Sequence, residues 1–410
     1  MNNNANLMKA IVSSCAFLVV ADCAVAQDWP QWRGANRDGK AAGFTAPKSW
    51  PKELAKKWNI PVGRADATPA LVGDRLYVFA RQDTDEVTLC LEAATGKELW
   101  RDKYPAGAAT GPAAEHPGPR SSPTVAEGKV VTLGVRGALS CLDAATGKVL
   151  WRKDDVSGWP QFFTAMSPVI VDGVCIAQLG GKDNGVIAAY DLATGNEKWK
   201  WAGEGPSYAS PVMMEAGGMK LVIAQTDKNL MALNAADGKV AWQMPFAGKG
   251  MGGYNMATPI VDGQNLIFSG SGRGTTAVKF EKAGDAMTAK ELWKNTDLSP
   301  QFNSPVLKNG LLFGLTQRGS FVCINAQNGQ TLWTDPTGNR GGFGSIVDAG
   351  PVMLALTPRS QLIVFEPSDK AYTEVASIKV ANKQTYAYPV LAGNRLYVED
   401  QDSLTLWSFE

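Results

Sequence analysis

Histidine is almost missing from this sequence, since His116 is the single one in 410 residues. Zinc sites built from several imidazoles are therefore excluded, and a Ser-His-Asp triad would have one candidate base. The G-x-S-x-G pattern of serine hydrolases is missing too. His116 stands between Glu115 and Pro117 in an insertion rich in Pro and Gly. We interpret it as a loop residue and predict no catalytic residue.

An excess of one charge is lacking as well. Forty Lys and Arg face 39 Asp and Glu, which leaves a net charge of +1. No global field would draw the chain to nucleic acid, and we expect no nucleic-acid partner. Hydrophobic residues make up 45% of the chain, and 43 Gly and 23 Pro are spread along it. This composition allows a large core with many turns and excludes disorder, collagen and coiled coil.

Adjacent cysteines and C-x-x-C pairs are missing, which argues against a zinc ribbon or a thioredoxin-type site. Four cysteines follow the N-terminal leader described below: Cys90, Cys141, Cys175 and Cys323. Three of them occupy one place in a repeat, in VTLCLEAATGKELW, ALSCLDAATGKVLW and FVCINAQNGQTLW. A Cys at one strand position of several units behaves as a small apolar residue, so we predict buried free thiols.

Long apolar runs are confined to the N-terminus. The mainly apolar stretch 10–20 is followed by Ala24-Val25-Ala26, a small-x-small cleavage pattern. We predict that residues 1–26 are a signal peptide cleaved near Ala26, which would place the mature chain in the periplasm or outside the cell. Nothing later approaches the roughly 20 apolar residues that a transmembrane segment needs. Cys23 could carry a lipid anchor, but Asp22 occupies the place of the usual small residue, so we favour cleavage without anchoring.

Two short patterns recur along the rest of the chain. The first is a polar turn that leads to a Trp, as in Asp143-AATGKVL-Trp151 and Asn234-AADGKVA-Trp242. The second is Ser or Thr followed by Pro at the start of an apolar strand: Thr68-Pro69, Ser122-Pro123, Ser167-Pro168, Ser210-Pro211, Thr258-Pro259 and Ser304-Pro305, continued by Gly350-Pro351 and Tyr388-Pro389. Neighbouring Pro of this series are 38 to 54 residues apart, which is typical of four-stranded propeller blades.

Eight such units predict an all-β fold, an eight-bladed β-propeller of four-stranded antiparallel blades. The last unit ends at SLTLWSFE and lacks a fourth strand, whereas Leu54 to Trp58 is a Trp strand with no unit before it. We therefore expect the N-terminal strand to complete the last blade and close the ring. The predicted domains are an N-terminal extended segment, 27–53, and a single propeller, 54–410. The Trp of each unit offers a flat face to pack between blades.

These turns and strand openings, with the leading segment Asp28-Trp-Pro-Gln-Trp-Arg-Gly34 and with Asp38-Gly39, resemble the PQQ-repeat, or quinoprotein alcohol dehydrogenase-like, β-propeller family of bacteria. The resemblance covers nearly all of the chain after the leader. It implies the fold but not one function. The family contains pyrroloquinoline-quinone (PQQ) dehydrogenases, a propeller lipoprotein of the outer-membrane barrel-assembly machinery, and secreted members without an assigned activity.

The dehydrogenases of this family are longer and carry a Cys-Cys disulfide near the quinone, with carboxylate and Asn side chains that bind calcium. This chain has no Cys-Cys pair, and its two dense carboxylate clusters lack the spacing of a calcium cage: Asp83/Asp85/Glu86 and Asp400/Asp402. We interpret them as solvated turn charges. The prediction is therefore no metal and no cofactor. PQQ and calcium belong to the alternative function, a PQQ-dependent alcohol dehydrogenase-like oxidoreductase.

Up-and-down blades place repetitive Asp-Gly and Ala-Thr-Gly-Lys turns on one face and variable loops on the other. Aromatic and Arg side chains in the variable loops suit a binding surface, although basic residues also occupy exposed turns without binding anything. The binding residues we predict are Arg64, Arg120, Phe162, Tyr208, Tyr254, Arg273, Phe302, Arg318 and Arg340. The predicted function is a non-catalytic binding or scaffold module for a protein or polysaccharide. The partner's identity and the oligomeric state stay open.

Overall fold

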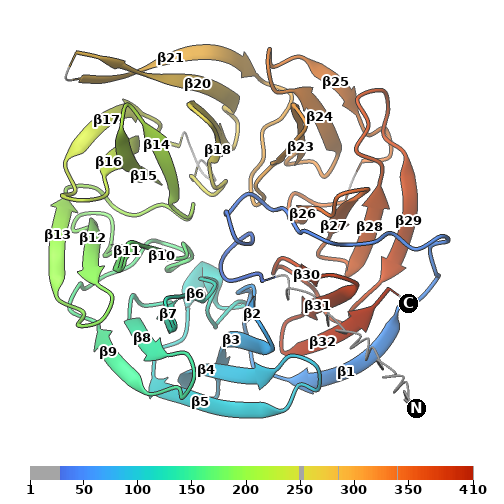
Figure 1. The fold of residues 1–410 in the computed structure, drawn as a ribbon, viewed down its shortest axis with the longest axis horizontal. Coiled ribbons are helices and arrows are strands. Elements are labelled where there is room, and N and C mark those ends of the chain that lie inside the picture. Colours follow the sequence, from blue (N-terminus) through green and yellow to red (C-terminus); the bar gives the residue numbers. More distant parts are fainter. Residues whose placement is uncertain (1–27, 249–253, 285, 339, 410) are drawn as a thin grey trace, which may run out of the picture.

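A computed structural model describes residues 28–248, 254–284, 286–338 and 340–409. Their strands form eight four-stranded antiparallel sheets, arranged as blades around a ring (Figure 1). The predicted eight-bladed β-propeller is confirmed. The predicted signal peptide, 1–26, lies outside the described residues.

Each blade begins with a short inner strand at the centre of the ring and continues outward through a second strand. The inner strands are β2 (Ala70–Val72), β6 (Thr124–Ala126), β10 (Val169–Val171), β14 (Val212–Ala216), β18 (Ile260–Asp262), β22 (Val306–Lys308), β26 (Ser345–Asp348) and β30 (Val390–Ala392). The second strands are β3 (Arg75–Gln82), β7 (Lys129–Leu133), β11 (Val174–Leu179), β15 (Met219–Gln225), β19 (Asn265–Gly270), β23 (Leu311–Leu315), β27 (Met353–Leu356) and β31 (Arg395–Glu399).

A third strand and an outer strand complete each blade, and one 3-10 helix, η1 (Gly111–Ala113), lies between blades 1 and 2. The third strands are β4 (Asp85–Glu92), β8 (Leu139–Asp143), β12 (Val186–Asp191), β16 (Asn229–Asn234), β20 (Gly274–Ala283), β24 (Phe321–Asn325), β28 (Gln361–Phe365) and β32 (Ser403–Ser408). The outer strands are β5 (Glu98–Pro105), β9 (Val149–Lys153), β13 (Glu197–Ala202), β17 (Val240–Pro245), β21 (Ala286–Asn295), β25 (Thr331–Thr334), β29 (Glu374–Lys379) and β1 (Ala55–Pro61).

The ring closes through β1. This strand pairs antiparallel with β32, from Ala55 opposite Ser408 to Pro61 opposite Ser403, so the last blade combines both ends of the propeller. The predicted closure is confirmed. It joins the first and last segments of the chain by strand pairing, which leaves no unpaired outer edge on β32.

The outer-strand Trp side chains join neighbouring blades, as predicted. Trp100 of blade 1 donates its indole N–H to the Ala144 carbonyl in the polar turn of blade 2, at 3.2 Å. The same bond to the next blade recurs around the ring: Trp58 to Ala93, Trp151 to Leu192, Trp199 to Ala235, Trp293 to Ala326 and Trp333 to Ser368. In blade 5 the long β20–β21 hairpin replaces the turn, and Trp242 packs edge-on against Phe280 of that hairpin at 4.9 Å.

Two further sequence predictions have different outcomes. The four cysteines Cys90, Cys141, Cys175 and Cys323 are buried and free, as predicted. The prediction that Gly350-Pro351 opens an inner strand is wrong, because the inner strand of blade 7 is β26 and Pro351 lies in the turn after it. Blade 7 enters the ring at Gly344-Ser345, without the Ser/Thr-Pro step.

The N-terminal segment lies in the central channel, where it forms a plug, residues 28–41, before it runs outward along blades 7 and 8 to reach β1 (Figure 1). Trp29 forms an antiparallel bridge with Leu71 of blade 1, and Lys40 forms a parallel bridge with Asp348 of blade 7. Farther along, Phe44 and Trp50 pack on Phe409 of blade 8. The sequence predicted an extended segment here but not its place on the axis.

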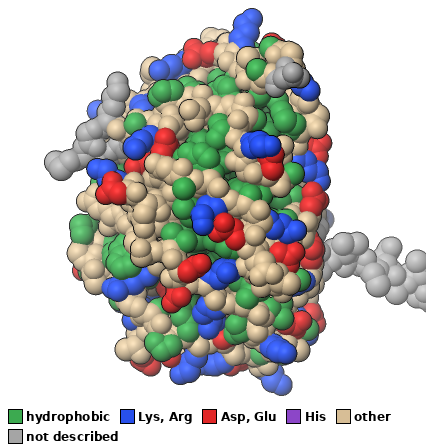
Figure 2. All heavy atoms as spheres, turned by 90° about the vertical axis from the view of Figure 1, so that its left-hand side faces the viewer, with side chains coloured by type: hydrophobic (Ala, Val, Ile, Leu, Met, Phe, Trp, Pro, Cys, Tyr) green, Lys and Arg blue, Asp and Glu red, His purple; other side chains and the backbone are tan. Residues whose placement is uncertain are grey.

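The outside of the ring carries charges of both signs. On the side shown in Figure 2, Lys and Arg alternate with Asp and Glu, and apolar side chains lie between them. Among the described residues, no helix is long and apolar enough to cross a membrane.

Candidate functional site

The variable loops that lead into the inner strands share one hydrogen-bonded support. The backbone N–H of the residue before each Pro donates to the hydroxyl of the equivalent residue in the following blade. The chain runs from Tyr388 through Thr68, Ser122, Ser167, Ser210 and Thr258 to Ser304, with N–O distances of 2.9 to 3.3 Å. We call it the hydroxyl chain. It fixes the height of the loops relative to one another, so their side chains are held on rigid strand ends.

Three of the predicted binding residues meet above this support, from the loops before β10, β14 and β18. The rings of Phe162, Tyr208 and Tyr254 contact one another edge to face, with centroids 5.2 to 6.2 Å apart. Tyr208 Oη accepts the Phe162 N–H at 3.0 Å, and Tyr254 donates to the Gln161 side chain at 2.9 Å. All three rings are half-buried. Burial raises the pKa of Tyr208 to about 12, so its hydroxyl stays protonated.

A second group of contacting rings lies in four other loops, those before β22, β26, β30 and β6. Phe302 stacks on Phe343 with parallel planes and centroids 4.0 Å apart. Phe343 contacts Tyr386, and Tyr386 contacts His116 at 4.9 Å. Phe302 and Phe343 are 36% and 39% exposed, so their faces are open to a partner. We name the seven side chains of both groups the aromatic collar: His116, Phe162, Tyr208, Tyr254, Phe302, Phe343 and Tyr386.

Polar contacts hold His116 of the collar and the neighbouring Arg120. His116 Nδ1 lies 2.8 Å from Asp66 Oδ2, which joins the loops entering blades 1 and 2. Arg120 donates from Nη2 to the His116 carbonyl at 2.7 Å, while its buried Nη1 has no acceptor among the described residues. Burial lowers the pKa of Arg120, and Asp66 opposes this effect. Arg64 is exposed and donates to the Glu115 carbonyl at 2.9 Å.

The other predicted cations also lie in the loops of this face. Two of them are bonded inside the molecule, and the third is exposed. Arg273 donates to the Phe246 carbonyl and to Asn255 Oδ1, both at 2.6 Å. Arg340 forms ion pairs with Asp335 and Glu374. Both guanidinium groups are therefore bonded inside the molecule, although Nε of Arg273 has no acceptor among the described residues. Arg318 is exposed, and none of the described residues pairs with it.

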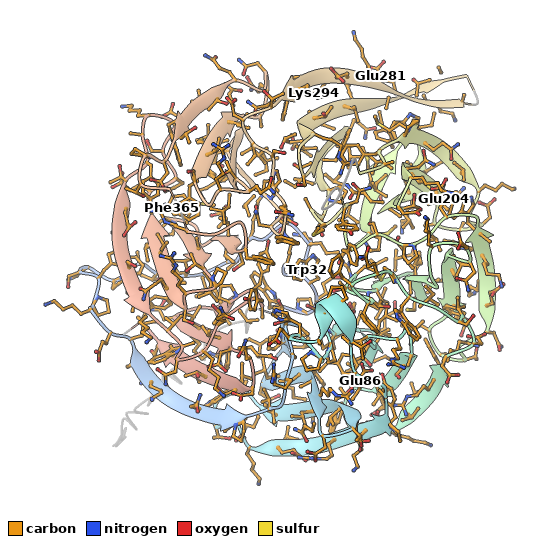
Figure 3. The ribbon with its side chains drawn as sticks, turned by 180° about the vertical axis from the view of Figure 1, so that it is seen from behind. Trp32, Glu86, Glu204, Glu281, Lys294 and Phe365 are labelled. Atoms are coloured by element: carbon orange, nitrogen blue, oxygen red, sulfur yellow. The ribbon has the colours of Figure 1, made fainter. Side chains whose placement is uncertain are left out.

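The plug forms the floor inside the collar. Trp32 lies near the centre of the ring when it is seen from behind (Figure 3). Its indole N–H donates to Thr258 Oγ1 of the hydroxyl chain at 3.1 Å, and its ring packs edge-on against Tyr388 at 4.7 Å. The channel is thus closed by an aromatic residue at the level of the strand entrances. The Trp-rich start of the chain was visible in the sequence, but nothing in its spacing indicated this position.

Sequence reasoning also missed a set of buried polar groups at the same end of the second strands. These groups occupy the same place in blades 3, 4 and 8. The first residue of each inner strand pairs with a residue of the second strand, and the polar residue follows that partner by two positions: Gln178, Gln225 and Glu399. Their side-chain oxygen and nitrogen atoms are buried without partners among the described residues. Burial, reinforced by Asp66 and Asp400, raises the pKa of Glu399 well above its usual range. A lone polar residue in an apolar strand was the available signal.

The interpretation of the carboxylate clusters as solvated turn charges is wrong for two members. Glu86 is 1% exposed, where it accepts hydrogen bonds from the Tyr104 hydroxyl and the Val135 N–H. Asp400 is 6% exposed and accepts the Ser403 N–H at 2.9 Å. The donors that water would otherwise supply come from Tyr104 and Val135 for Glu86, and from the same turn for Asp400.

The calcium and quinone set of the dehydrogenases does not fit the described residues. Nowhere in the described ranges do three or more His, Cys, Asp or Glu side chains gather in a way that could hold a metal ion. The cysteines are four separate thiols, and the plug fills the channel with Trp32, Arg33 and Arg37. The residues present therefore support no reaction step that runs through a bound quinone.

Comparisons with known proteins agree with the fold. The outer membrane protein assembly factor BamB of Burkholderia pseudomallei is 26% identical over 361 residues, which are 85% of this chain and 86% of that protein. The quinohemoprotein alcohol dehydrogenase of Comamonas testosteroni is 31% identical over 153 residues, 36% of this chain and 21% of that protein. These relatives divide between an assembly factor and an enzyme.

Solved structures show the same division. The crystal structure of BamB from Moraxella catarrhalis has a TM-score of 0.65 and 17% identity, and the match covers 87% of this chain and 100% of that one. A europium-containing methanol dehydrogenase has a TM-score of 0.71 and 12% identity, and the match covers 93% and 98%. At these identities the likeness shows the fold alone.

The match to a family model is more extensive. The PQQ_2 model, described as outer membrane protein assembly factor BamB, matches residues 37–182 and, in an overlapping match, 90–335. Because the two matches together span well over half of the sequence, this chain belongs to the PQQ_2 family of BamB-type propellers.

Proposed function

We propose that this propeller is a non-catalytic protein-binding scaffold of outer membrane protein assembly, and that its partner docks on the aromatic collar. The carrying observation is the collar itself, in which the seven loops that enter blades 2 to 8 bring ring side chains into two groups of contacts at one channel end. Half-buried aromatic side chains supply large contact areas at low entropic cost, which is typical of energetic centres in protein interfaces.

Each predicted binding residue has a part in this proposal. Phe162, Phe302 and the collar tyrosines contact the partner, Arg120 holds its loop through the bond to the His116 carbonyl, and Arg64 and Arg318 lie exposed on the same face. Arg273 and Arg340 keep their loops in place through the internal bonds described above. The predicted leader would place the scaffold outside the cytoplasm. A protein partner is preferred to a polysaccharide because the family's described member is a protein assembly factor.

Site-specific crosslinking in cells tests this proposal. A photoactivatable residue at Phe343 should crosslink to a protein of the outer membrane assembly machinery. The matched control is the same residue at Lys148, which is exposed in an Ala-Thr-Gly-Lys turn on the opposite face. Crosslinks of equal yield from both positions, or from Lys148 alone, would contradict docking on the collar.

A PQQ-dependent dehydrogenase is the second candidate function, and the 31% identity to the Comamonas testosteroni enzyme favours it. Titration of the purified protein with PQQ and calcium separates the two candidates. Because a ligand that binds the native state raises its melting temperature, binding would be visible in thermal unfolding. A rise in melting temperature together with dye reduction by an alcohol would replace the scaffold proposal. No rise and no turnover would exclude the dehydrogenase.

A further inference from the structure

Two arginines of the plug are buried in the channel without an acidic partner among the described residues. Arg33 is 0% exposed and Arg37 is 4% exposed. Both have a positive backbone φ, 61° and 57°, which non-Gly residues rarely adopt. A buried charge is costly unless it is paired or fully hydrogen-bonded. The surroundings of each guanidinium therefore decide whether a counter-charge is needed.

Neutral acceptors satisfy Arg37 completely. Its Nε donates to Gln31 Oε1 at 2.8 Å, and Nη1 donates to the carbonyls of Ser167 and Pro211 at 3.1 and 3.0 Å. Nη2 donates to the Pro168 carbonyl. Burial lowers the pKa of Arg37 to about 9. Gln31 of the plug and the carbonyl groups of blades 3 and 4 thus take every nitrogen of this side chain, and no further ligand is needed.

Arg33 differs, because only one of its three guanidinium nitrogens is bonded. Nη2 donates to the Pro305 carbonyl at 2.6 Å and lies 3.3 Å from the Asp38 carbonyl. Nε and Nη1 are buried and have no acceptor among the described residues. The ring of Tyr388, 5.9 Å from the guanidinium carbon, offers a weak cation–π contact. At least two N–H donors of a buried cation are left without a partner.

Asp28 of the plug accepts the Gly73 N–H at 2.8 Å, and two further acids near the plug are engaged with lysines. The Asp38 carboxylate lies 3.7 Å from Lys40 Nζ and accepts the Lys40 N–H at 3.3 Å. Asp348 of blade 7 is paired with Lys308 at 2.7 Å. Neither carboxylate is left to neutralise Arg33.

Arg33 also lies where the hydroxyl chain is interrupted. It contacts Pro305 of blade 6 and Tyr388 of blade 8, on either side of blade 7, which has no Ser/Thr-Pro step. A Cβ built on Gly39 would lie 3.2 Å from Arg33 Nη2 and 3.4 Å from the Ile346 carbonyl, so the guanidinium is close to β26. Ser345, the residue before Ile346, has a buried hydroxyl without a partner. Arg33 of the plug and Ser345, the first residue of β26, thus each leave donors unused.

We propose that a small inorganic anion binds in the channel against Nε and Nη1 of Arg33, at the interruption of the hydroxyl chain in blade 7. The anion would complete the hydrogen bonds of a buried cation and supply the charge that no described carboxylate supplies. It would also join the plug to blades 6, 7 and 8. Its role is structural and is independent of the proposed scaffold function.

Anomalous diffraction from crystals of the full chain prepared with bromide tests the site directly. We expect an anomalous peak within hydrogen-bonding distance of Arg33 Nε or Nη1. The absence of such a peak, with water density in its place, would overturn the proposal.

Thermal unfolding gives a second readout. At equal ionic strength, replacing gluconate by bromide should raise the melting temperature saturably, by about 3 °C when bromide is roughly 100 times its Kd. Arg33→Met should abolish this rise, whereas the matched control Arg318→Met, at an exposed Arg, should keep it. A rise that persists in Arg33→Met would place the anion elsewhere and overturn the proposal. If Arg33→Met does not fold, the bromide peak decides alone.

Discussion

The guanidinium of Arg340 lies beside Asp335, whose side chain is 0% exposed, and over the rings of Phe321 and Tyr372. We predict that Arg340→Met lowers the free energy of unfolding by about 3 kcal/mol, because it leaves a buried carboxylate without its partner. Chemical denaturation measures this loss. The control Arg318→Met removes an exposed guanidinium and should change stability by less than about 0.5 kcal/mol. Equal losses in both variants would mean that the ion pair contributes nothing.

Glu399 carries a pH dependence whose sign follows from its environment. Burial first, then Asp66 and Asp400, raise its pKa in the folded protein above the unfolded value. Because its pKa is raised, Glu399 keeps its proton to a higher pH in the folded state than in the unfolded state. Its contribution to the free energy of unfolding is therefore fully present below about pH 4.3 and is lost as pH rises toward the folded pKa. Glu399→Gln removes this loss. The variant should therefore gain stability over the native protein as pH rises.

The difference in free energy of unfolding between Glu399→Gln and the native protein should grow by at most about 1.4 kcal/mol per pH unit, the value for one proton. Urea unfolding of both proteins between about pH 4 and pH 8 measures it. Because other groups titrate equally in the two proteins, the difference isolates Glu399. Two stability curves that stay parallel over this range would show that Glu399 has the same pKa in the folded and unfolded chains.

The residue types of the candidate site could be predicted from the sequence, but their contacts could not. Successive residues of the set Phe162, Tyr208 and Tyr254 stand 46 positions apart in the sequence. Their side chains meet because their loops enter blades 3, 4 and 5, which are neighbours in the propeller. Charge gave a poorer signal. Arg318 and Arg340 look alike in the sequence, yet only Arg340 has a buried acid beside it. Such a partner depends on loop geometry, which has no periodic pattern.

At the scale of the element, the polar turn and the Trp of the preceding blade form one unit. Gly147 has φ +75°, and a Cβ there would lie 2.5 Å from the Trp100 ring. Gly310 has φ +77°, and nothing lies within 4 Å of its Cβ position. Gly310→Ala should cost about 1 kcal/mol for the left-handed backbone alone.

Gly147→Ala should cost a further 1 to 3 kcal/mol, roughly the price of overpacking, because Trp100 must move from the turn. Denaturant midpoints of the two variants give the comparison. Tryptophan fluorescence adds a local readout, since only Gly147→Ala should change the environment of Trp100. If both variants lose the same stability, the turn does not clamp the indole.

Elements were predictable where the repeat is regular and not where a blade departs from it. The polar turn and Trp predicted the outer strands of blades 1 to 4, and Pro predicted the inner strands that begin at Val169 and Val212. Blade 7 was misplaced, because Gly350-Pro351 imitates the step but lies in a turn. The hydroxyl of each step also had an unforeseen function. It bonds to the neighbouring blade, a contact between residues more than 40 positions apart.

At the scale of the whole molecule, two separate devices hold the ring: β1 closes it at the rim and the plug occupies it at the axis. The first was predictable, because a missing strand at one end and an extra strand at the other can be counted. The second was not. The contacts of Arg33 and Arg37 reach carbonyl groups of blades 3, 4 and 6, and such acceptors leave no trace in side-chain sequence.

Truncation separates the two devices. A chain that begins at Val62 lacks both β1 and the plug, and it should aggregate, because β32 would expose an edge with Leu404 and Leu406, which are 0% and 3% exposed in the closed ring. A chain that begins at Leu54 keeps the six residue pairs of β1 with β32 and lacks the plug and residues 42–53, with Phe44 and Trp50. It should be less stable but monomeric in size-exclusion chromatography with light scattering. Aggregation of both chains would mean that strand pairing cannot hold the ring without the plug, and a monodisperse chain from Val62 would mean that closure by β1 is not needed at all.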